Sequence, residues 1–379
     1  MSTVLMVANY APDVGFAWWL MENFWMQLSE LSRQSGLQPL IAYPTSGVVP
    51  ARIRDADIET IQQPIAGRGM AEFWHTILLV RARRVRMIYF TDRSFSSWRY
   101  AVLRLAGVSQ ILTHDHSPGD RPPVRGLKGA FKSAWRRLPW ISADRQICVS
   151  PLMRRRAMEN ARIPEDRCVV VQNGIVPVAC TGDRSYVHRK LGLSNHHRLC
   201  ITVARAHTYK RIDFVVWVAK RCVRDLGRRD VSFIFCGDGP DLERLQQLVR
   251  QLDLQDYFHF AGRRNDIPAF LCAADIAIHP SRGEAFSLAV VEYMSAGLAL
   301  IVPDIPSVCQ TVEHGVTGAI YPDGDVDAAA EAVCRMLDDP ARIAEMGRRS
   351  AQVVLEKYSF VDMNNRFREI IREHLRSIR

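Results

Sequence analysis

The chain has 379 residues, of which 48% are apolar and 24% are charged. This composition excludes a largely disordered protein and favours two globular domains. Basic residues exceed acidic ones by 10, and the excess lies in the first half: residues 1–190 carry 26 basic and 15 acidic residues, and residues 191–379 carry 24 and 25. We therefore expect an acidic partner, whether nucleic acid, anionic membrane or phosphorylated substrate, to meet the N-terminal half.

Apolar runs and cysteines exclude further classes of protein. No apolar run approaches the roughly 18–20 residues that span a bilayer. The first ten residues lack a charged leader, so we expect a buried strand there rather than a signal peptide. The nine cysteines contain no Cys-x-x-Cys pair, and most lie inside apolar runs, which predicts neither a disulfide framework nor a zinc site. A reducing cytosol fits this pattern.

Short apolar runs alternate with amphipathic stretches along the whole chain. The runs predict strands at 4–9, 39–43, 87–91, 110–114, 145–150 and 168–172, and then at 199–204, 231–236, 258–262, 275–279, 299–302 and 318–321. Helical periodicity is clearest at 17–33, 153–161, 213–224, 242–252, 328–337 and 358–379. Such alternation is typical of parallel sheets with crossover helices. It predicts an α/β protein of two doubly wound, Rossmann-like domains facing each other across a cleft, with a seam near 173–197 and domains at 1–175 and 176–357.

Two glutamates, Glu284 and Glu292, flank the predicted start of a helix near Ser287. Glu284 follows a strand ending at His279, where ligands bind in open parallel sheets. Backbone N–H groups near Ser287 and Leu288 would point at an anion. The residues alone leave two interpretations open: carboxylates that hold a sugar phosphate, or a helix cap and a surface carboxylate.

The stretch from Glu284 to Gly297 resembles the Glu-x7-Glu motif of the family 4 glycosyltransferases, retaining enzymes of the GT-B fold that use nucleotide-diphosphate sugars. The resemblance implies that Glu284 holds the sugar hydroxyls and Glu292 the nucleotide ribose. It also implies a donor-binding C-terminal domain and an acceptor-binding N-terminal domain, with helix 358–379 packing back on the latter. The donor-binding residues implied in this way are Arg205, Lys210, Gly237, Gly239, Arg263, Glu284, Phe286, Ser287, Leu288 and Glu292.

Arg205 and Lys210 follow the first strand of the second domain and resemble the diphosphate clamp of the same family. Two cations placed there can neutralise a departing diphosphate. The alternative is a solvated helix start. Arg211 stands where the family usually has Gly, and it would either add a phosphate contact or face solvent.

Gly237, Gly239 and Pro240 resemble the family's Gly-x-Gly-Pro turn, which allows a ligand to approach the backbone closely. Arg263 follows a strand in the region where the family contacts the base. A plain turn at the end of that strand is the alternative reading.

In the N-terminal domain, the resemblance gives His114 a catalytic role near the reacting sugar and His116 a second contact, while Gly15 matches a glycine of the acceptor or phosphate loop. A metal pair, a catalytic base and packed polar residues are the alternatives for the histidines. Aspartates at alternate positions, 55/57 and 323/325/327, match the Asp-x-Asp pattern of metal-binding transferases. They share no site with the glutamates, and we interpret them as structural. No metal is expected.

Arg125, Lys128, Lys132 and Arg136 recur at three- and four-residue steps beside an apolar stripe of Leu127, Phe131, Trp135 and Leu138. This pattern predicts an interfacial helix on an anionic membrane. An ordinary surface helix with its apolar face on the core is the alternative, and no recognition motif supports nucleic-acid binding.

We therefore predict a retaining GT-B glycosyltransferase, catalytically dependent on His114, Glu284, Arg205 and Lys210, that requires no cofactor and uses a UDP-sugar rather than a GDP-sugar. The expected acceptor is a lipid-linked saccharide of bacterial envelope or exopolysaccharide synthesis, at the inner face of the cytoplasmic membrane. Two alternatives remain: a GT-B nucleotide-sugar epimerase, and a non-catalytic basic protein that binds membrane or nucleic acid.

Overall fold

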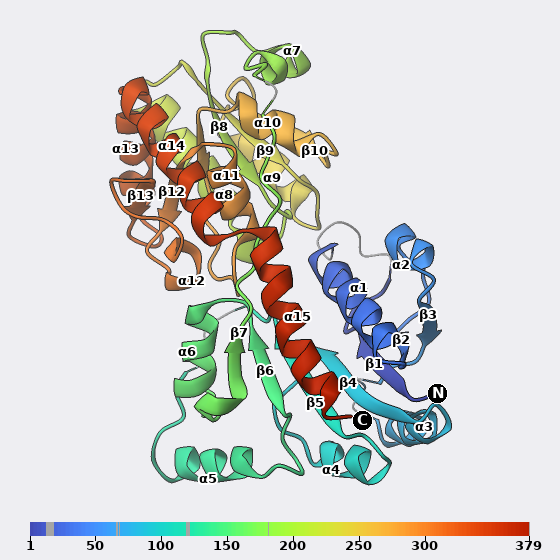
Figure 1. The fold of residues 1–379 in the computed structure, drawn as a ribbon. Coiled ribbons are helices and arrows are strands. Elements are labelled where there is room, and N and C mark those ends of the chain that lie inside the picture. The colour runs from blue at the N-terminus through green and yellow to red at the C-terminus, as the bar shows by residue number, and fades with distance from the viewer. Residues whose placement is uncertain (13–18, 66, 68, 119–121, 181, 379) are drawn as a thin grey trace. The chain divides into compact units, whose positions relative to one another are not determined.

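The computed structural model describes residues 1–12, 19–65, 67, 69–118, 122–180 and 182–378. The chain forms two compact units (Figure 1), unit 1 from Met1–Gln172 with Val361–Arg379, and unit 2 from Asn173–Phe360. Each unit is built on one parallel sheet, so the predicted α/β fold with two Rossmann-like halves is confirmed.

The described part of unit 1 forms a seven-stranded parallel sheet in the order β3-β2-β1-β4-β5-β6-β7. The chain winds outward from β1 in one direction and then from β4 in the other, which creates a switch point between these two strands. The strands are β1 (Thr3–Val7), β2 (Gln38–Tyr43), β3 (Glu59–Gln62), β4 (Val85–Thr91), β5 (Gln110–Asp115), β6 (Arg145–Cys148) and β7 (Cys168–Val170).

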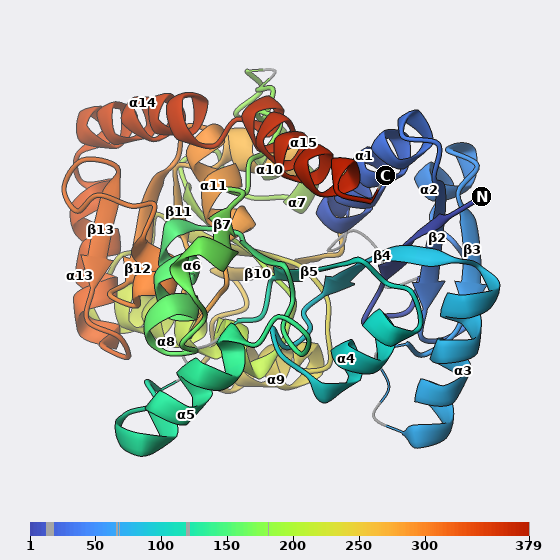
Figure 2. The ribbon, with the colours of Figure 1, turned by 60° about the horizontal axis from the view of Figure 1, so that its bottom comes forward.

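Helices cover both faces of this sheet: Figure 2 shows α1 and α15 on one side and α3, α4 and α5 on the other. Apolar residues line both faces of the central strands, and β1 is buried along its whole length, as expected for parallel strands between two helical layers. The helices of unit 1 are α1 (Trp19–Gln34), α2 (Ala51–Asp55), α3 (Met70–Ala82), α4 (Trp98–Leu105), α5 (Gly126–Arg137), α6 (Pro151–Glu159) and the 3-10 turn η2 (Glu165–Arg167).

The final helix, α15 (Phe360–Arg376), packs on unit 1. Its Phe367 ring lies 4.7 Å from Phe24 of α1 and 6.0 Å from Tyr89 of β4, measured between ring centroids. Arg368 of α15 also forms an ion pair with Glu30 of α1 at 2.8 Å. The core of unit 1 therefore includes side chains from both ends of the chain.

The described part of unit 2 forms a six-stranded parallel sheet in the order β10-β9-β8-β11-β12-β13, with its switch point between β8 and β11. Its strands are β8 (Arg198–Val203), β9 (Val231–Cys236), β10 (Phe258–Gly262), β11 (Ile276–Ile278), β12 (Ala299–Pro303) and β13 (Gly318–Tyr321). Its helical elements are α7 (Tyr186–Leu191), η3 (Thr208–Lys210), α8 (Ile212–Lys220), the π turn η4 (Arg221–Asp225), α9 (Leu242–Gln251), α10 (Ile267–Ala273), α11 (Leu288–Ser295), α12 (Pro306–Cys309), α13 (Val326–Leu337) and α14 (Pro340–Lys357).

Two local features differ from the sequence prediction. Strand β3 was not predicted, because it is a short edge strand with polar residues at three of its four positions and no buried side chain. The predicted helix 213–224 is α-helical only to Lys220 and continues as the π turn η4.

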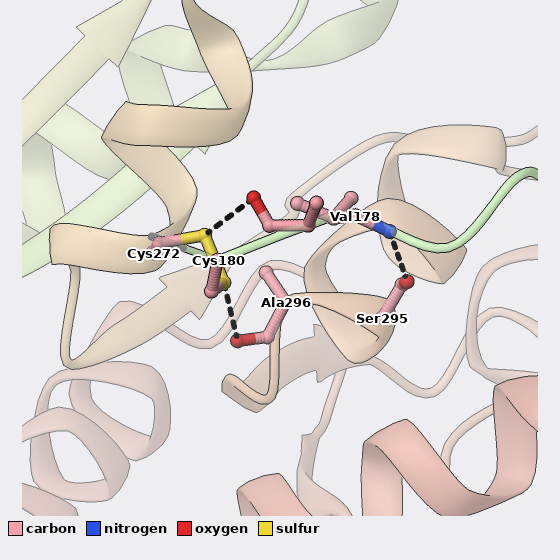
Figure 3. The surroundings of a disulfide bond; sticks show 6 residues. Val178, Cys180, Cys272, Ser295 and Ala296 are labelled. Atoms are coloured by element: carbon pink, nitrogen blue, oxygen red, sulfur yellow. Dashed lines mark hydrogen bonds between the residues drawn. A yellow bond between two sulfur atoms is a disulfide. The ribbon is translucent and has the colours of Figure 1, made fainter. Parts of the chain in front are cut away.

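The prediction that the cysteines form no disulfide is wrong at one position. Cys180, in the segment that follows the unit boundary, is bonded to Cys272 of α10, 92 residues away (Figure 3). Beside it, the Val178 backbone N–H donates to Ser295 Oγ at 2.8 Å, so the segment is attached to α11 as well. Neither cysteine has a sequence signal for pairing, because the fold of unit 2 alone brings them together. The remaining seven cysteines are free.

Along the described residues, no helix has both the length and the apolarity that crossing a membrane requires.

Candidate active site

The switch point of unit 2 brings together two loops that are distant in sequence. Strands β8 and β11 are adjacent and parallel, with Ile276 opposite Cys200. Their carboxyl ends lead into the loop that contains Arg205 and Lys210 and into the loop that contains Glu284. Tyr293 of α11 fixes this geometry: its buried hydroxyl accepts from the Val203 N–H at 2.6 Å and donates to the Val203 carbonyl at 3.1 Å. Helix α11 is thereby attached to the end of β8.

Glu284 is the centre of a charged cluster in this region. Its carboxylate forms an ion pair with Lys210 Nζ, and its Oε1 lies 3.3 Å from His279 Nε2. The Glu284 backbone N–H donates to Ser307 Oγ at 3.2 Å, which holds the loop in place. Burial disfavours the carboxylate charge, but the Lys210 charge and the His279 hydrogen bond outweigh it and hold the pKa of Glu284 at about 2. Glu284 is therefore an anion at neutral pH.

His279 supports Glu284 from the end of β11. The side chain is fully buried, and burial lowers its pKa, so the ring is neutral at neutral pH. Its Nε2 lies 3.1 Å from Ser287 Oγ as well as near Glu284, and one ring nitrogen thus connects the loop to the N-cap residue of α11. Sequence analysis assigned no role to His279, Ser307 or Tyr293. The only available signal was that His279 ends an apolar strand with a polar residue.

Glu292 lies in the second turn of α11 and faces a different environment from Glu284. It is half-buried, and no described side chain forms an ion pair or hydrogen bond with its carboxylate. Burial alone raises its pKa to about 7. The two glutamates therefore differ in protonation: one is held ionised by a cation, and the other titrates near neutral pH.

The first turn of α11 presents backbone N–H groups in this region. Ser287 is the N-cap, and its side chain makes no capping bond, since its hydroxyl lies beside His279. Phe286 is buried and packs on Tyr358, with ring centroids 5.6 Å apart, and Leu288 begins the helix. These contacts fix the helix start, whose partial positive charge favours an anion.

Three cations follow β8, and they differ in their surroundings. Arg205 is exposed, and no described residue pairs with it. Lys210 is half-buried, stands 5.2 Å from the centre of the Tyr209 ring and pairs with Glu284. Arg211 adopts a left-handed backbone with φ 52°, pairs with Asp323 and stacks over Phe214. A left-handed backbone is the conformation that Gly adopts most easily, which explains why the related family has Gly here. The Arg211 side chain neither faces solvent nor extends into the cluster around Glu284.

The glycines after β9 are required by close packing. A Cβ atom on Gly237 would lie 1.8 Å from the Ala204 carbonyl oxygen, and Gly239 has a φ of +155° with the Ala206 carbonyl only 2.5 Å from such an atom. The turn thus presses against the loop that contains Arg205. Arg263 follows β10 and is exposed, whereas the adjacent Arg264 pairs with Asp266 at 2.6 Å.

In unit 1, His114 is fully buried at the end of β5, 4.8 Å from Phe24 and 6.4 Å from Phe367 between ring centroids. Its Nδ1 lies 2.5 Å from the Tyr89 hydroxyl, and its Nε2 has no partner among the described residues. Burial, and next the neighbouring His116, lower its pKa. The His116 ring lies next to it, with the two ring centroids 4.2 Å apart.

His116 is half-buried, and its backbone N–H donates to Asp92 Oδ1 at 2.5 Å. Gly15 lies outside the described residues, so the structure gives no position for it. Among the residues that the structure does describe, no three His, Cys, Asp or Glu side chains are grouped to bind a metal ion.

Asp325 is the N-cap of α13, and its side chain accepts from the Ala328 N–H at 2.9 Å. This contact is a structural one, in line with the interpretation of the aspartates as structural residues.

Helix α5 presents its apolar stripe to solvent. Leu127 is 90% exposed and Phe131 70% exposed, and the only buried residue of the helix is Gly129. The alternative prediction, in which this apolar face packs on the core, is therefore wrong. Arg125 and Lys128 are exposed, whereas Lys132 and Arg136 are half-buried. Arg136 also lines a cavity of about 130 Å³, together with Asp115 and Arg156.

Known proteins match each half of the chain. The family described as "Glycosyltransferase Family 4" matches residues 21–178, and the family described as "Glycosyl transferases group 1" matches residues 183–353. Among curated proteins, the N-acetyl-alpha-D-glucosaminyl L-malate synthase of Bacillus anthracis is 25% identical over 194 residues, which are 51% of this chain and 50% of that protein. The matched region thus spans about half the length of this relative.

Two solved structures share the fold along almost the whole chain. A glycosyltransferase from Rickettsia africae has a TM-score of 0.78 at 18% identity and covers 98% of both chains. Anabaena Alr3699/HepE, solved in complex with UDP-glucose, has a TM-score of 0.75 at 18% identity and covers 98% of this chain and 99% of that one. With a glycosyltransferase family matched to each half and GT-B glycosyltransferases as structural neighbours, this chain belongs to the family 4-type glycosyltransferases of the GT-B fold.

Proposed function

We propose that the chain transfers a sugar from a nucleotide-diphosphate sugar, and specifically a UDP-sugar, to a lipid-linked saccharide with retention of anomeric configuration. The observation that carries this proposal is the cluster at the carboxyl ends of β8 and β11. There, Lys210 pairs with Glu284, and Tyr293 attaches α11 to the end of β8. Nucleotides bind at this place in open parallel sheets, beyond the carboxyl ends of the two strands that form the switch point.

Each donor group has a chemically suitable partner in unit 2. Arg205, Lys210 and the first-turn N–H groups of α11 supply positive charge for a diphosphate. Glu284, an anion held by Lys210 and His279, can only accept hydrogen bonds, which suits sugar hydroxyls. Glu292 would accept from ribose hydroxyls once it is ionised. UDP-glucose bound to a protein of the same fold supports a uridine nucleotide.

The proposed catalysis consists of charge stabilisation and positioning. Arg205 and Lys210 stabilise the negative charge that develops on the departing diphosphate. Glu284 holds the sugar in the orientation that exposes one face of the anomeric carbon. The departing phosphate takes the proton of the acceptor hydroxyl, so no protein nucleophile is needed. His114 would position His116, and His116 would contact the acceptor.

The proposal for the acceptor is based on helix α5. Its exposed Leu127 and Phe131 beside Arg125 and Lys128 suit an interfacial helix on an anionic bilayer. We propose a lipid-linked saccharide of bacterial envelope or exopolysaccharide synthesis as acceptor, reached from the cytoplasmic face by a peripherally bound enzyme.

A panel of UDP- and GDP-sugars tests the donor assignment through thermal stabilisation and release of nucleoside diphosphate. A UDP-sugar should stabilise the protein and be turned over when lipid-linked saccharides are added. Conversion of a nucleotide sugar to its epimer in the absence of acceptor would establish the epimerase instead. A protein stabilised by neither nucleotide would contradict the glycosyltransferase assignment altogether.

A further inference from the structure

Large apolar side chains are exposed on three helices of unit 1, and not on α5 alone. On α3, Met70, Trp74 and Leu78 stand at four-residue steps and are exposed, while Phe73 and Ile77 of the same helix are buried against the sheet. The spacing places the three exposed residues on one face. A helix that is apolar on both faces is normally covered on both faces, so the outer face of α3 is suited to a partner.

The exposed residues of α3 and α4 are connected by direct contacts. Trp98, the first residue of α4, is 49% exposed, and its ring meets the edge of Phe73 of α3 at 5.4 Å between centroids. Arg99 lies over both of these rings, 4.7 Å from Phe73 and 5.7 Å from Trp98. Leu105, seven residues or about two turns further along α4, is exposed as well.

The contacts continue from α4 to the segment that follows α5. The Ser97 N–H at the start of α4 donates to the Ile141 carbonyl at 2.7 Å. Next to Ile141, Trp140 is 59% exposed, and it follows the α5 stripe, in which Phe131 stacks on Trp135 at 6.2 Å. Both views place α3, α4 and α5 along the same side of the unit 1 sheet (Figures 1 and 2).

Charge identifies the kind of partner. The three helices together contain seven basic residues and one acidic residue, Glu72, which reaches back to the N-terminus of α3. A second copy of the chain would bring the same positive charge to the contact, which disfavours self-association. Tryptophan rings bordered by Arg and Lys are typical of the interface between lipid headgroups and acyl chains of an anionic bilayer.

We propose that α3, α4 and α5 form one membrane-docking face, with Trp74, Trp98, Trp135 and Trp140 at the lipid interface. The inference rests on the proposed function, which places only α5 at the membrane, and extends it to a broad surface. Contact along three helices, rather than one, fixes the orientation of unit 1 on the bilayer, because a single helix would allow the unit to rotate about the helix axis.

The test compares three variants in flotation with vesicles of phosphatidylcholine containing phosphatidylglycerol. The double variant Trp74→Ser/Leu78→Ser changes only exposed side chains of α3, and Trp217→Ser changes an exposed tryptophan of unit 2 as a matched control. The α3 variant should bind these vesicles roughly tenfold more weakly at both low and high salt, since apolar burial does not depend on ionic strength. Trp217→Ser should bind like the wild type, and Arg125→Glu/Lys128→Glu should weaken binding chiefly at low salt.

Fluorescence quenching by lipids with brominated acyl chains gives an independent measurement. Wild-type tryptophan emission should be quenched on binding, and Trp74→Ser/Leu78→Ser should lose part of that quenching. If this variant binds and quenches like the wild type while Arg125→Glu/Lys128→Glu does not bind, α5 docks alone and the extended face is overturned, with the proposed function intact.

Failure of the wild type to bind anionic vesicles would overturn both the face and the membrane part of the proposed function. A wild-type oligomer in light scattering that dissociates in the α3 variant would overturn the proposal in favour of a protein interface.

Discussion

Lys210 and Glu284 form an ion pair at the carboxyl ends of β8 and β11, although 74 residues separate them in the chain. Both side chains are largely shielded, with 16% and 12% exposed, so the pair is not a solvated surface contact. It places an anion and a cation together beyond the carboxyl ends of the two central strands, where a sugar diphosphate would present hydroxyls and phosphate.

Replacing Glu284 should abolish most of the transferase activity. We expect Glu284→Gln to lower kcat on the order of 100-fold or more, because the amide cannot provide the charged acceptor for sugar hydroxyls. Steady-state release of UDP with the identified donor measures this, and UDP binding should change far less. Glu313→Ala, which changes an exposed glutamate of the same unit, is the control. Full activity of Glu284→Gln would remove Glu284 from the proposed mechanism.

Nucleotide binding should depend on the ionisation of Glu292. Because burial raises its pKa to about 7, the carboxylate becomes available to ribose hydroxyls as the pH rises through neutrality. UDP affinity, measured by calorimetry between about pH 6 and pH 8, should therefore increase with pH. Glu292→Gln serves as the control, since it retains the titration of UDP itself. Identical pH profiles for the two proteins would contradict the role of Glu292.

The same raised pKa has a consequence for stability. The folded state favours protonated Glu292. The stability that this protonation gives the folded state is therefore fully present below the usual carboxyl pKa of about 4.5 and is lost as pH rises through about 7. Glu292→Gln should therefore gain stability relative to the wild type at pH 8 but not at pH 4, by up to about 3 kcal/mol. Urea unfolding at both pH values measures the difference, and equal differences at both would contradict it.

Arg205 should be important for activity and unimportant for folding. The side chain is exposed and pairs with no described residue, so Arg205→Ala should change the free energy of unfolding by less than about 0.5 kcal/mol. The loss of one diphosphate contact should weaken UDP binding roughly tenfold or more, and uridine binding much less. Equal losses for UDP and uridine would show that Arg205 does not contact the diphosphate.

Gly237 should tolerate no side chain. A Cβ atom would lie 1.8 Å from the Ala204 carbonyl, and the backbone there has no room to move without displacing the loop that contains Arg205. Gly237→Ala should cost about 2–4 kcal/mol of stability, as severe overpacking does. Gly227→Ala is a matched control, with a positive φ of 71° but nothing within 4 Å of the added atom, and should cost only about 1 kcal/mol. Equal losses of stability in the two variants would show that the steric clash with the Ala204 carbonyl does not destabilise Gly237→Ala.

The Cys180–Cys272 bond gives a thiol count that depends on the compartment. Protein that keeps the bond should show seven reactive thiols when denatured without reductant, and nine after reduction. A reducing cytosol would leave all nine free. Where the bond forms, reduction should lower the stability of unit 2 by about 2–4 kcal/mol, because it closes a long loop. An unchanged melting temperature on reduction would contradict a stabilising role.

The sequence by itself determined the fold class and the position of the glutamate motif. Apolar runs of strand length, separated by amphipathic stretches, specify parallel sheets because a strand buried on both faces must be apolar throughout. The loop with Glu284 and the helix with Glu292 followed from that pattern, as did the basic and apolar stripes of α5. These are local signals, in which neighbouring residues decide the structure.

Tertiary structure alone decided which groups meet. Strand order places β8 beside β11, and this adjacency brings Lys210 to Glu284. The fold of unit 2 likewise joins Cys180 to Cys272, 92 residues away. Packing of α1 and α15 buries His114, and the outer face of α3 remains exposed because only its other face meets the sheet. Each of these outcomes depends on contacts between residues far apart in the chain. Hydrophobic periodicity reports which face of an element is apolar, but it does not report what covers that face.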